Sequence, residues 1–285
     1  MPFFSARRGL HLGYKILITF VMALFASTVQ AYHLPLWEAG IGAGWIHAPH
    51  YRGSKAEKDY ALPLPYMVYR GERVAADRDG LRGRLFDSEN VKLNMSVAGN
   101  VPVPSDTGGA REGMPGLDPI LEFGPSLNIR LWHKSDRIAL LLKLPFRAAI
   151  SIGDPIFDYQ GLVFSPYLQL KTKIHRRKSN WRFKFSTGPM WGDSRYHNYF
   201  YEVDPAYVTD QRGEYKANSG YSGIRYTVTL SRNSKRWYFG SFARYDSLDG
   251  ATFADSPLVE TNDYFVYGVF MAWIFANSSD RARHH

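Results

Sequence analysis

The sequence predicts an all-β protein, an antiparallel transmembrane β-barrel of the outer-membrane type. Apolar and polar residues alternate over long stretches, a pattern typical of strands whose two faces meet different surroundings. The composition, with 19 Tyr, 18 Phe, 7 Trp and 25 Gly, favours strands and turns over helices. Short polar turns also alternate with long loops, as they do in bacterial barrels.

The first residues predict a secretory signal peptide over 1–31. Arg7, Arg8 and Lys15 precede the apolar run 16–26, which is followed by small residues at 29–31. A membrane anchor is the weaker alternative, because this run is shorter than the roughly 20 residues that a spanning helix needs. The chain has no cysteine, which excludes disulfides, a thiol nucleophile and Cys-ligated metal.

Alternation identifies the strands of the barrel, which we expect to occupy residues 32–275. In 91–101, Val91 and Leu93 fall on one face and Lys92 and Asn94 on the other. The same alternation recurs in 121–131, 164–174, 181–186 and 224–231. A soluble, lipocalin-like periplasmic barrel would also alternate. The long strands and the repeated full charges on the polar face favour the membrane barrel.

The spacing of turns and loops predicts the number of strands. Tight turns are expected at 87–90, 133–136, 175–180 and 232–235, and long loops at 48–59, 102–117, 148–158, 192–214 and 248–261. With short turns in the periplasm and an even number of strands, both termini are periplasmic. Ten strands result if residues 60–86 cross the membrane once, and twelve is the alternative.

Two prolines complicate this count, because Pro63 and Pro65 lie within the strand-like stretch 61–70. Proline has no N–H to donate to a sheet, so its strand must be unpaired on one side, bulged or outside the main sheet. We expect residues 61–70 and 72–80 to form an extra hairpin or bent extension at the extracellular side. Its bend would be at Gly71, and the chain would then descend through 80–86.

Several segments together resemble one protein family. The stretch "APHYRGSKAEKDYALPLPYMVYRG" (48–71) is similar to the start of the MipA/OmpV family of outer-membrane proteins, and 164–170, 192–205, 215–223 and 254–260 follow in the order of that family. The motif residues are Tyr51, Gly53, Pro63, Pro65, Tyr66, Tyr69, Arg70, Ser256 and Pro257. The resemblance covers 37–275 and implies an outer-membrane location, with motifs that are structural and not catalytic.

The resemblance also implies partners. The founding member of the family is a scaffold between a murein lytic transglycosylase and a bifunctional murein synthase, and other members are surface antigens, adhesins or porin-like proteins. Barrels of this kind end at an aromatic residue, whereas here Phe275 is followed by "ANSSDRARHH". We therefore expect residues 276–285 to be a flexible periplasmic tail.

The inward face is expected to be basic. Its cations are Lys92, Arg130, Lys143, Arg147, Lys171, Lys173, Arg182, Lys184, Arg225 and Arg244, against few acids, chiefly Glu38, Glu122 and Asp246. Charges cannot lie unpaired in a dry core, so the lumen is expected to be hydrated or neutralised by loop acids. An anion-favouring pore or ligand cavity is one interpretation, and a packed polar plug in a narrow barrel is the other.

The periplasmic turns are expected to be basic as well. The candidate docking residues are Lys134, Arg137, Arg176, Arg177, Lys178, Arg232, Lys235 and Arg236. They predict either a docking face for a murein enzyme or anchorage to lipid head groups of the outer membrane. Nothing indicates a nucleic-acid partner.

An enzymatic barrel is the rival class. Asp193, Ser194, His197, Asp204 and Asp210 share one loop and could supply catalytic groups, but no nucleophile motif is present. The sequence therefore predicts no enzymatic activity and no cofactor. His47, His50, His284 and His285 lack metal-ligand spacing, so no metal site is predicted either.

The first and last strands are expected to pair and to close the barrel. The first places Gly40, Gly42 and Gly44 inward, and the last places Tyr264, Phe270 and Ile274 inward. Aromatic rings would then cover glycine backbone, which supports sheet glycines. Aromatic girdles at the two membrane interfaces are expected from Trp37, Trp45, Trp132, Trp181, Trp191, Trp237 and Trp273.

Overall fold

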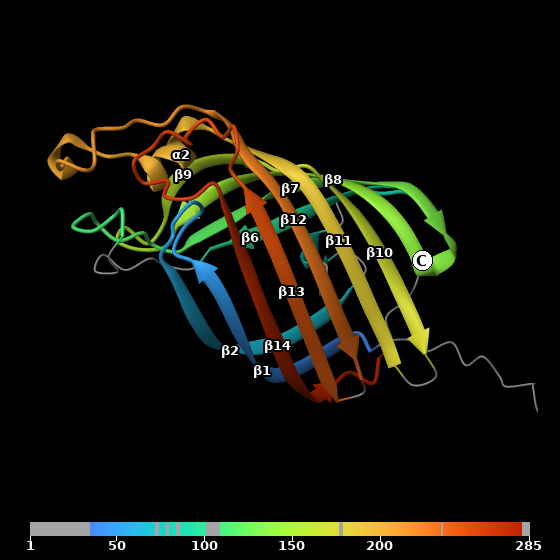
Figure 1. Ribbon diagram of the computed structural model, residues 1–285. Helices are drawn as coiled ribbons and strands as arrows, with labels where there is room; N and C mark the ends of the chain where they lie inside the picture. Colours follow the sequence, from blue (N-terminus) through green and yellow to red (C-terminus); the bar gives the residue numbers. More distant parts are fainter. Residues whose placement is uncertain are drawn as a thin grey trace, which may run out of the picture. The chain divides into compact units, whose positions relative to one another are not determined.

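Long antiparallel strands dominate the computed structural model, which describes residues 35–71, 74–77, 80–83, 86–100, 109–176, 179–234 and 236–280 (Figure 1). These residues belong to the unit Pro35–His285. The predicted signal peptide, 1–31, lies outside them. Among the described residues, no helix has both the length and the apolar character needed to cross a membrane.

Long strands account for most of the described chain. They are β1 (Trp37–Pro49), β2 (Glu57–Arg70), β6 (Val91–Gly99), β7 (Ile120–Lys134), β8 (Ile138–Ser151), β9 (Asp158–Phe164) continued by β10 (Tyr167–Arg176), β11 (Ser179–Gly192), β12 (Gly220–Asn233), β13 (Trp237–Ser247) and β14 (Asp263–Asn277). The short strands are β3 (Val74–Asp77), β4 (Gly80–Gly83) and β5 (Phe86–Asp87). The helical segments are α2 (Ser194–Tyr201) and two single 3₁₀ turns, η1 (Ser135–Arg137) and η2 (Pro205–Tyr207).

The strands form one antiparallel sheet that curls into a barrel. Its order is β4-β3-β2-β1-β14-β13-β12-β11-β10-β8-β7-β6-β5, and β9 pairs with both β8 and β11. β4 also lies against β6, which brings the two ends of the sheet together. The fold class predicted from the sequence is therefore confirmed. The described residues contain ten long crossings when β9 and β10 are counted as one. The short strands β3 and β4 form a hairpin, and counting these two strands as well gives twelve.

The two ends of the barrel differ as the loop lengths predict. Ser88–Asn90 and η1 lie at one end of the barrel, together with the last residues of β10 and β12 and the first residues of β11 and β13, and we call this the turn end. The long loops and α2 lie at the opposite end, which we call the cap end (Figure 1). The first residues of β1 and the last of β14 are paired at the turn end.

The outward face is apolar, which distinguishes a membrane barrel from a soluble one. Along β14, exposed and buried residues alternate strictly over its first half, and after Asp263 the exposed ones are Phe265, Tyr267 and Val269. Phe265 is 59% exposed, Met271 57% and Phe275 59%, whereas Ala272 and Ile274 between them are buried. A soluble sheet exposes its polar face to water, so this arrangement needs lipid outside. The lipocalin-like alternative is therefore rejected.

Tryptophans of the two expected girdles lie on the outside at both ends. Trp45 and Trp191 are exposed towards the cap end, and Trp37, Trp132, Trp237 and Trp273 towards the turn end. Trp132 falls on the inward register by simple alternation. A bulge between Arg130 and Trp132 shifts the register, and both Leu131 and Trp132 are 50% exposed as a result.

The predicted location of Pro63 and Pro65, in an extension beyond the barrel wall, was wrong. They lie in the middle of β2, opposite Ala43 and Ile41 of β1, and β2 crosses the whole barrel wall instead of projecting beyond it. In the described residues the other edge of β2 pairs with β3 only at Tyr69 and Arg70. The prolines are tolerated because, within the part of the chain that the structure describes, the edge of β2 away from β1 has no ladder partner at these positions.

The hairpin predicted at the extracellular side lies at the turn end. Gly71 follows β2 directly, and Tyr69 of β2 pairs with both Trp37 of β1 and Ala76 of β3. Because Trp37 begins the first strand, this end of β2 is the turn end. The extracellular side was predicted because a count of ten strands required residues 60–86 to cross the membrane once.

The chain near the C-terminus also differs from the prediction. β14 continues two residues beyond Phe275, to Asn277. The backbone N–H of Ser278 then donates to the carbonyl oxygen of Trp37 at 3.0 Å, and that of Leu36 donates to the carbonyl oxygen of Asp280 at 2.9 Å. Residues 276–280 are therefore held against the start of β1, and 281–285 lie outside the described residues.

The first and last strands close the barrel as predicted. β1 pairs with β14, with Gly40 opposite Ile274 and Gly44 opposite Phe270. The ring of Phe270 covers the backbone here, since a Cβ added at Gly42 would lie 2.6 Å from its Cζ atom. The glycines thus give the aromatic side chain the space it occupies inside the barrel.

Candidate functional site

The cap is built from α2 and the loops 193–219 and 248–262, and it covers the cap end of the barrel (Figure 1). Asp193 begins α2 as its N-cap, and its carboxylate accepts hydrogen bonds from the backbone N–H groups of Tyr196 (2.8 Å) and Leu162 (3.0 Å). One acidic side chain therefore fixes both the start of the helix and its position on β9.

Stacked aromatic rings form the centre of the cap. Tyr201 of α2 stacks on Phe253 of the 248–262 loop, with ring centroids 3.8 Å apart and an interplanar angle of 9°. Both side chains are fully buried. The hydroxyl of Ser256 donates to the carbonyl oxygen of Tyr201 at 2.9 Å, and Tyr51 donates to that of Leu258 at 2.7 Å. Two distant loops are thus packed into one unit.

Most family-motif residues hold this unit or the turn end together. Gly53 has a φ of +92°, and its carbonyl oxygen accepts from Glu260 and Thr261. At the turn end, Glu38 is buried and accepts from Tyr66 at 3.1 Å and from Arg70 at 2.8 Å. The outward side chains of the motif are Pro63, Pro65 and Tyr69, and Pro257 is half-buried in the cap loop.

A buried ionic cluster lies directly beneath the cap. Asp246 of β13 is fully buried, and its carboxylate lies 2.8 Å from Arg225 Nε, 2.6 Å from Arg244 Nε and 3.8 Å from Arg52 Nη2. Arg52 also donates to the carbonyl oxygen of Ser222 at 2.7 Å. One carboxylate thus links two barrel strands to the loop after β1. Arg52 was not among the predicted site residues, because its only signal in the sequence was its place between Tyr51 and Gly53.

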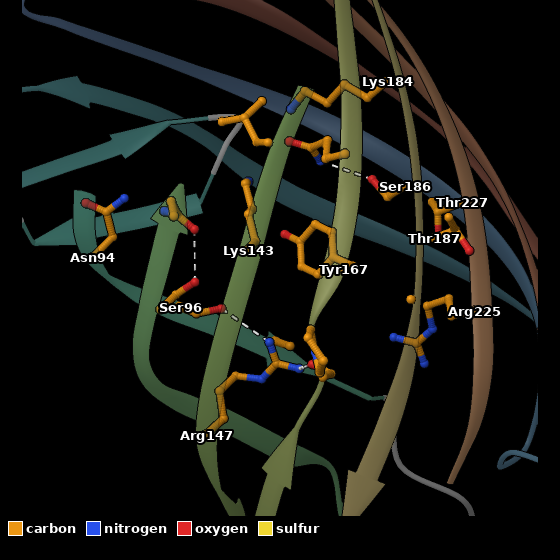
Figure 2. Close-up of a pocket in the computed structure, with 18 of the residues that line it drawn as sticks. Asn94, Ser96, Lys143, Arg147, Tyr167, Lys184, Ser186, Thr187, Arg225 and Thr227 are labelled. Atoms are coloured by element: carbon orange, nitrogen blue, oxygen red, sulfur yellow. Dashed lines mark hydrogen bonds between the residues drawn. The ribbon is translucent and has the colours of Figure 1, made fainter. Parts of the chain in front are cut away.

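A second ionic contact ties α2 to the opposite wall. Glu122 of β7 accepts from the hydroxyl of Tyr196 at 3.0 Å and from Arg147 Nε at 2.9 Å. Arg147 also donates to Ser165 at 2.8 Å, and its contact with Ser96 is drawn in Figure 2. Burial raises the pKa of Tyr196, with Glu122 adding to the effect, so this hydroxyl remains a donor.

Three of the five loop residues considered for catalysis, Asp193, His197 and Asp204, make structural contacts. Asp204 caps η2 by accepting from Ala206 N at 3.0 Å. His197 Nε2 lies 2.6 Å from Ser222 Oγ, and its Nδ1 lies 2.6 Å from the carbonyl oxygen of Asn218. Although this is a Ser–His pair, both side chains have no exposed surface, so no substrate reaches the hydroxyl.

The state of His197 makes cap stability depend on pH. Burial lowers the pKa of His197, with Arg52 lowering it further while the Asn218 carbonyl and Asp193 oppose the shift. Below about pH 6.5 the unfolded chain therefore takes up a proton that the folded cap does not. We expect the thermal midpoint of unfolding to fall as the pH drops through about 6.5, and to fall less steeply in His197→Gln.

Gel mobility after graded heating at several pH values measures how the thermal midpoint of unfolding depends on pH in the wild type and in His197→Gln. His50, which is also buried in the cap and whose pKa burial also lowers, leaves a residual slope in the variant. A slope equal to that of the wild type would contradict the role of His197.

Below the cap, the barrel encloses a basic chamber of about 610 Å³. Its cations are Lys92, Arg130, Lys143, Arg147, Lys171, Lys184 and Arg225. Figure 2 shows Lys143, Lys184 and Arg225 projecting into the same space from β8, β11 and β12. Among the described residues that line it, none is acidic. A smaller cavity of about 270 Å³ lies between this chamber and the cap and includes Arg244.

The predicted lumen cations are thus largely brought together. Seven of the ten line the basic chamber and Arg244 lines the smaller cavity. Lys173 and Arg182 line neither of these cavities, but they face each other across β10 and β11 nearer the turn end. The acids predicted inside, Glu38, Glu122 and Asp246, are all buried and each contacts at least one arginine.

The structure describes the side chains of only some of the candidate docking residues. Lys134, Arg137, Arg232 and Arg236 are exposed at the turn end. Arg177, Lys178 and Lys235 lie outside the described residues, as does the side chain of Arg176.

Solved structures with a similar fold include an outer-membrane channel from Pseudomonas putida (14% identity, TM-score 0.41, 86% of this chain and 98% of that one) and a FadL homologue from Pseudomonas aeruginosa (9%, 0.32, 84% and 90%). Likeness at this level carries no functional information. No curated protein sequence matches the chain.

One family model matches most of the barrel. It is described as MipA, MltA-interacting protein, and it matches residues 41–275, from the first strand to the last. The resemblance seen in the motifs is confirmed. With its apolar outer face and its closed antiparallel sheet, the chain therefore belongs to the MipA family and is an outer-membrane β-barrel.

Proposed function

We propose that this barrel is a non-enzymatic scaffold whose turn end docks enzymes of murein turnover, namely a murein lytic transglycosylase and a bifunctional murein synthase. The observation that carries the proposal is the contrast between the two ends. The cap end is covered by a packed, hydrogen-bonded cap of long loops, whereas at the turn end the exposed cations Lys134, Arg137, Arg232 and Arg236 flank short turns. The family is named for interaction with MltA, which supports the same choice of partner.

The exposed cations suit a docking role of limited strength. Lys134 and Arg137 flank the turn after β7, and Arg232 and Arg236 flank the turn after β12. Exposed charges contribute little to barrel stability, but they steer a partner of opposite charge and set the salt dependence of association. Both turns belong to the same end of the barrel, so one partner surface could contact both.

The test is binding of a purified murein lytic transglycosylase to the barrel in detergent. Replacing Lys134, Arg137, Arg232 and Arg236 with Gln together is expected to weaken binding at low salt by about tenfold, through slower association. The matched control replaces four exposed cations near the cap end with Gln: Lys55, Lys58, Arg195 and Lys216. It removes the same charge and is expected to bind as the wild type does.

Anchorage to lipid head groups makes the opposite prediction. Membrane retention of the turn-end variant would then fall, while enzyme binding would be unchanged. Equal binding by wild type and turn-end variant at low and physiological salt would disprove docking through these turns.

A conducting pore is the second candidate, and the basic chamber favours it. Conduction would require the cap to leave the cap end. Three sets of contacts oppose this: the Tyr201–Phe253 stack, the Tyr196–Glu122 hydrogen bond and the salt bridges of Asp246. We therefore place the scaffold first.

A further inference from the structure

The hairpin formed by β8 and β9 carries an exposed apolar tip. Ile156 is 66% exposed and Phe157 is 70% exposed, and Ile152 and Tyr159 beside them are each 41% exposed. We call these four residues the hairpin tip. They lie at the cap end, where the chain passes from β8 into β9. Exposed apolar side chains that are grouped in this way mark a surface that contacts a membrane or a partner.

The hairpin tip continues the lipid-facing surface of the barrel. The outward face of the hairpin is apolar through three successive pairs, which are Phe146 with Phe164, Ala148 with Leu162, and Ile150 with Tyr159. Ile152 and Phe157 follow on the two sides of the hairpin and, by alternation, belong to the same face. Phe164 stacks on Trp191 with ring centroids 6.0 Å apart, so this apolar surface begins at the girdle. From Phe146 to Ile152 it extends roughly 20 Å along the strand.

The outward face becomes charged sooner on other strands. On β1 the next outward residue beyond Trp45 is His47, whose ring nitrogens lie 2.9 Å from the carboxylates of Asp59 and Glu57 on β2. On β14 the outward series ends at Asp263. Charged side chains on the outward face mark the level at which a strand leaves the hydrocarbon layer. The apolar surface therefore reaches further beyond the girdle on the β8–β9 hairpin than on β1 and β2.

A cation lies beside the hairpin tip. The side chain of Arg195 on α2 is 57% exposed, and its guanidinium lies 5.2 Å from the ring centroid of Tyr159 and 3.7 Å from the Asp158 carboxylate. Tyrosine and arginine are both suited to a membrane interface, where an arginine keeps its stem on apolar surface and its head near polar groups. The tip thus combines apolar side chains with a neighbouring cation, as surfaces that lie on membranes do.

We propose that the hairpin tip is a membrane anchor, which inserts Ile152, Ile156 and Phe157 into the lipid leaflet at the cap end. The occupant is lipid because the tip continues the surface that lipid already covers, and no charged residue interrupts the outward face of the hairpin between Phe146 and Ile152. Asp154 in the same turn is exposed, so insertion is shallow, at the level of the head groups.

This anchor is separate from the proposed docking of murein enzymes. The tip lies at the cap end, and the docking residues lie at the turn end. Insertion of the tip and binding of an enzyme can therefore succeed or fail independently.

Fluorescence quenching on the whole barrel in phosphatidylcholine vesicles tests the proposal. The chain has no cysteine, so Phe157→Cys takes a single thiol-reactive fluorophore. Lipid with a nitroxide near the ester end of its acyl chain is expected to quench this fluorophore by about half or more, because interfacial anchors reach the boundary between head groups and chains. Aqueous iodide is expected to quench it little. The matched control is Val208→Cys, an apolar residue of the cap that is 45% exposed, and the opposite pattern is expected there.

A second variant tests whether the apolar side chains hold the tip in the lipid. A fluorophore on Ile152→Cys is expected to be quenched by the nitroxide lipid. With Ile156→Ser and Phe157→Ser added, it is expected to be quenched by iodide instead. Exposed loop positions such as these affect stability little, and heat-modifiable gel mobility shows that each labelled protein is folded.

Three results from folded protein would overturn the anchor. The first is equal iodide quenching at positions 157 and 208. The second is nitroxide quenching at position 152 that persists after both serine substitutions. The third is energy transfer between fluorophores on position 157 of different molecules with no nitroxide quenching, which would place a second copy of the chain on the tip instead of lipid.

Discussion

Replacing Asp246 with asparagine is expected to lower the free energy of unfolding by about 3–5 kcal/mol, the usual cost of removing one partner from a buried ionic cluster. The reason is the arrangement of charge around this carboxylate. It is fully buried and contacts Arg225, Arg244 and Arg52. Asparagine keeps the shape but not the charge, so three guanidinium groups would remain close together without their shared anion.

The change is expected to affect the cap first. Arg52 belongs to the loop after β1 and also donates to Ser222 and to the hydroxyl of Tyr264. Repulsion from Arg225 and Arg244 would push Arg52 away and loosen the loop that carries Tyr51 and Gly53. Limited proteolysis of the folded barrel should therefore cut the cap loops of Asp246→Asn faster than those of the wild type.

The temperature at which gel mobility changes on heating measures the loss of stability. Asp249→Asn is the matched control, because Asp249 is an exposed acid three residues along the same chain segment. It is expected to unfold at the temperature of the wild type. An unchanged unfolding temperature for Asp246→Asn would show that the arginines find other partners and that the cluster is not the anchor of the cap.

The substitution Gly42→Leu is also expected to have a large effect, because it should prevent closure of the barrel. A Cβ at position 42 would lie 2.6 Å from the carbonyl oxygen of Met271 and 2.6 Å from Phe270 Cζ. The ring could rotate away, but the carbonyl belongs to the paired backbone of β14 and cannot. Overpacking typically costs about 1–3 kcal/mol, and the rigid contact here places this site at the upper end or beyond.

The expected result is a protein without the heat-modifiable band, found in aggregates and not in the membrane fraction. Gly213→Leu is the control, because no heavy atom lies within 4 Å of a Cβ added there and its loop is exposed. Normal insertion and normal mobility of Gly42→Leu would show that β1 and β14 can separate at this position without loss of the barrel.

The barrel, its two unlike ends and the pairing of its first and last strands could all be predicted from the amino-acid sequence. Lipid outside and water inside impose a two-residue alternation of apolar and polar side chains, and this alternation can be recognised directly in the sequence, as in β14. The same alternation places glycines of β1 and aromatic residues of β14 on the inward face, so their complementary sizes could be recognised in the sequence. The basic inner face followed from the alternation alone.

The positions of Pro63 and Pro65, the exposure of Trp132 and the contacts that close the cap end could not be predicted and depend on the folded chain. The prolines depend on which edge of β2 has a ladder partner, and Trp132 depends on a bulge. The cap depends on contacts between residues far apart in the chain, such as Tyr201 with Phe253 and Arg52 with Asp246. Strand periodicity is a local property, whereas these contacts arise only when the barrel brings its loops together, so no local pattern encodes them.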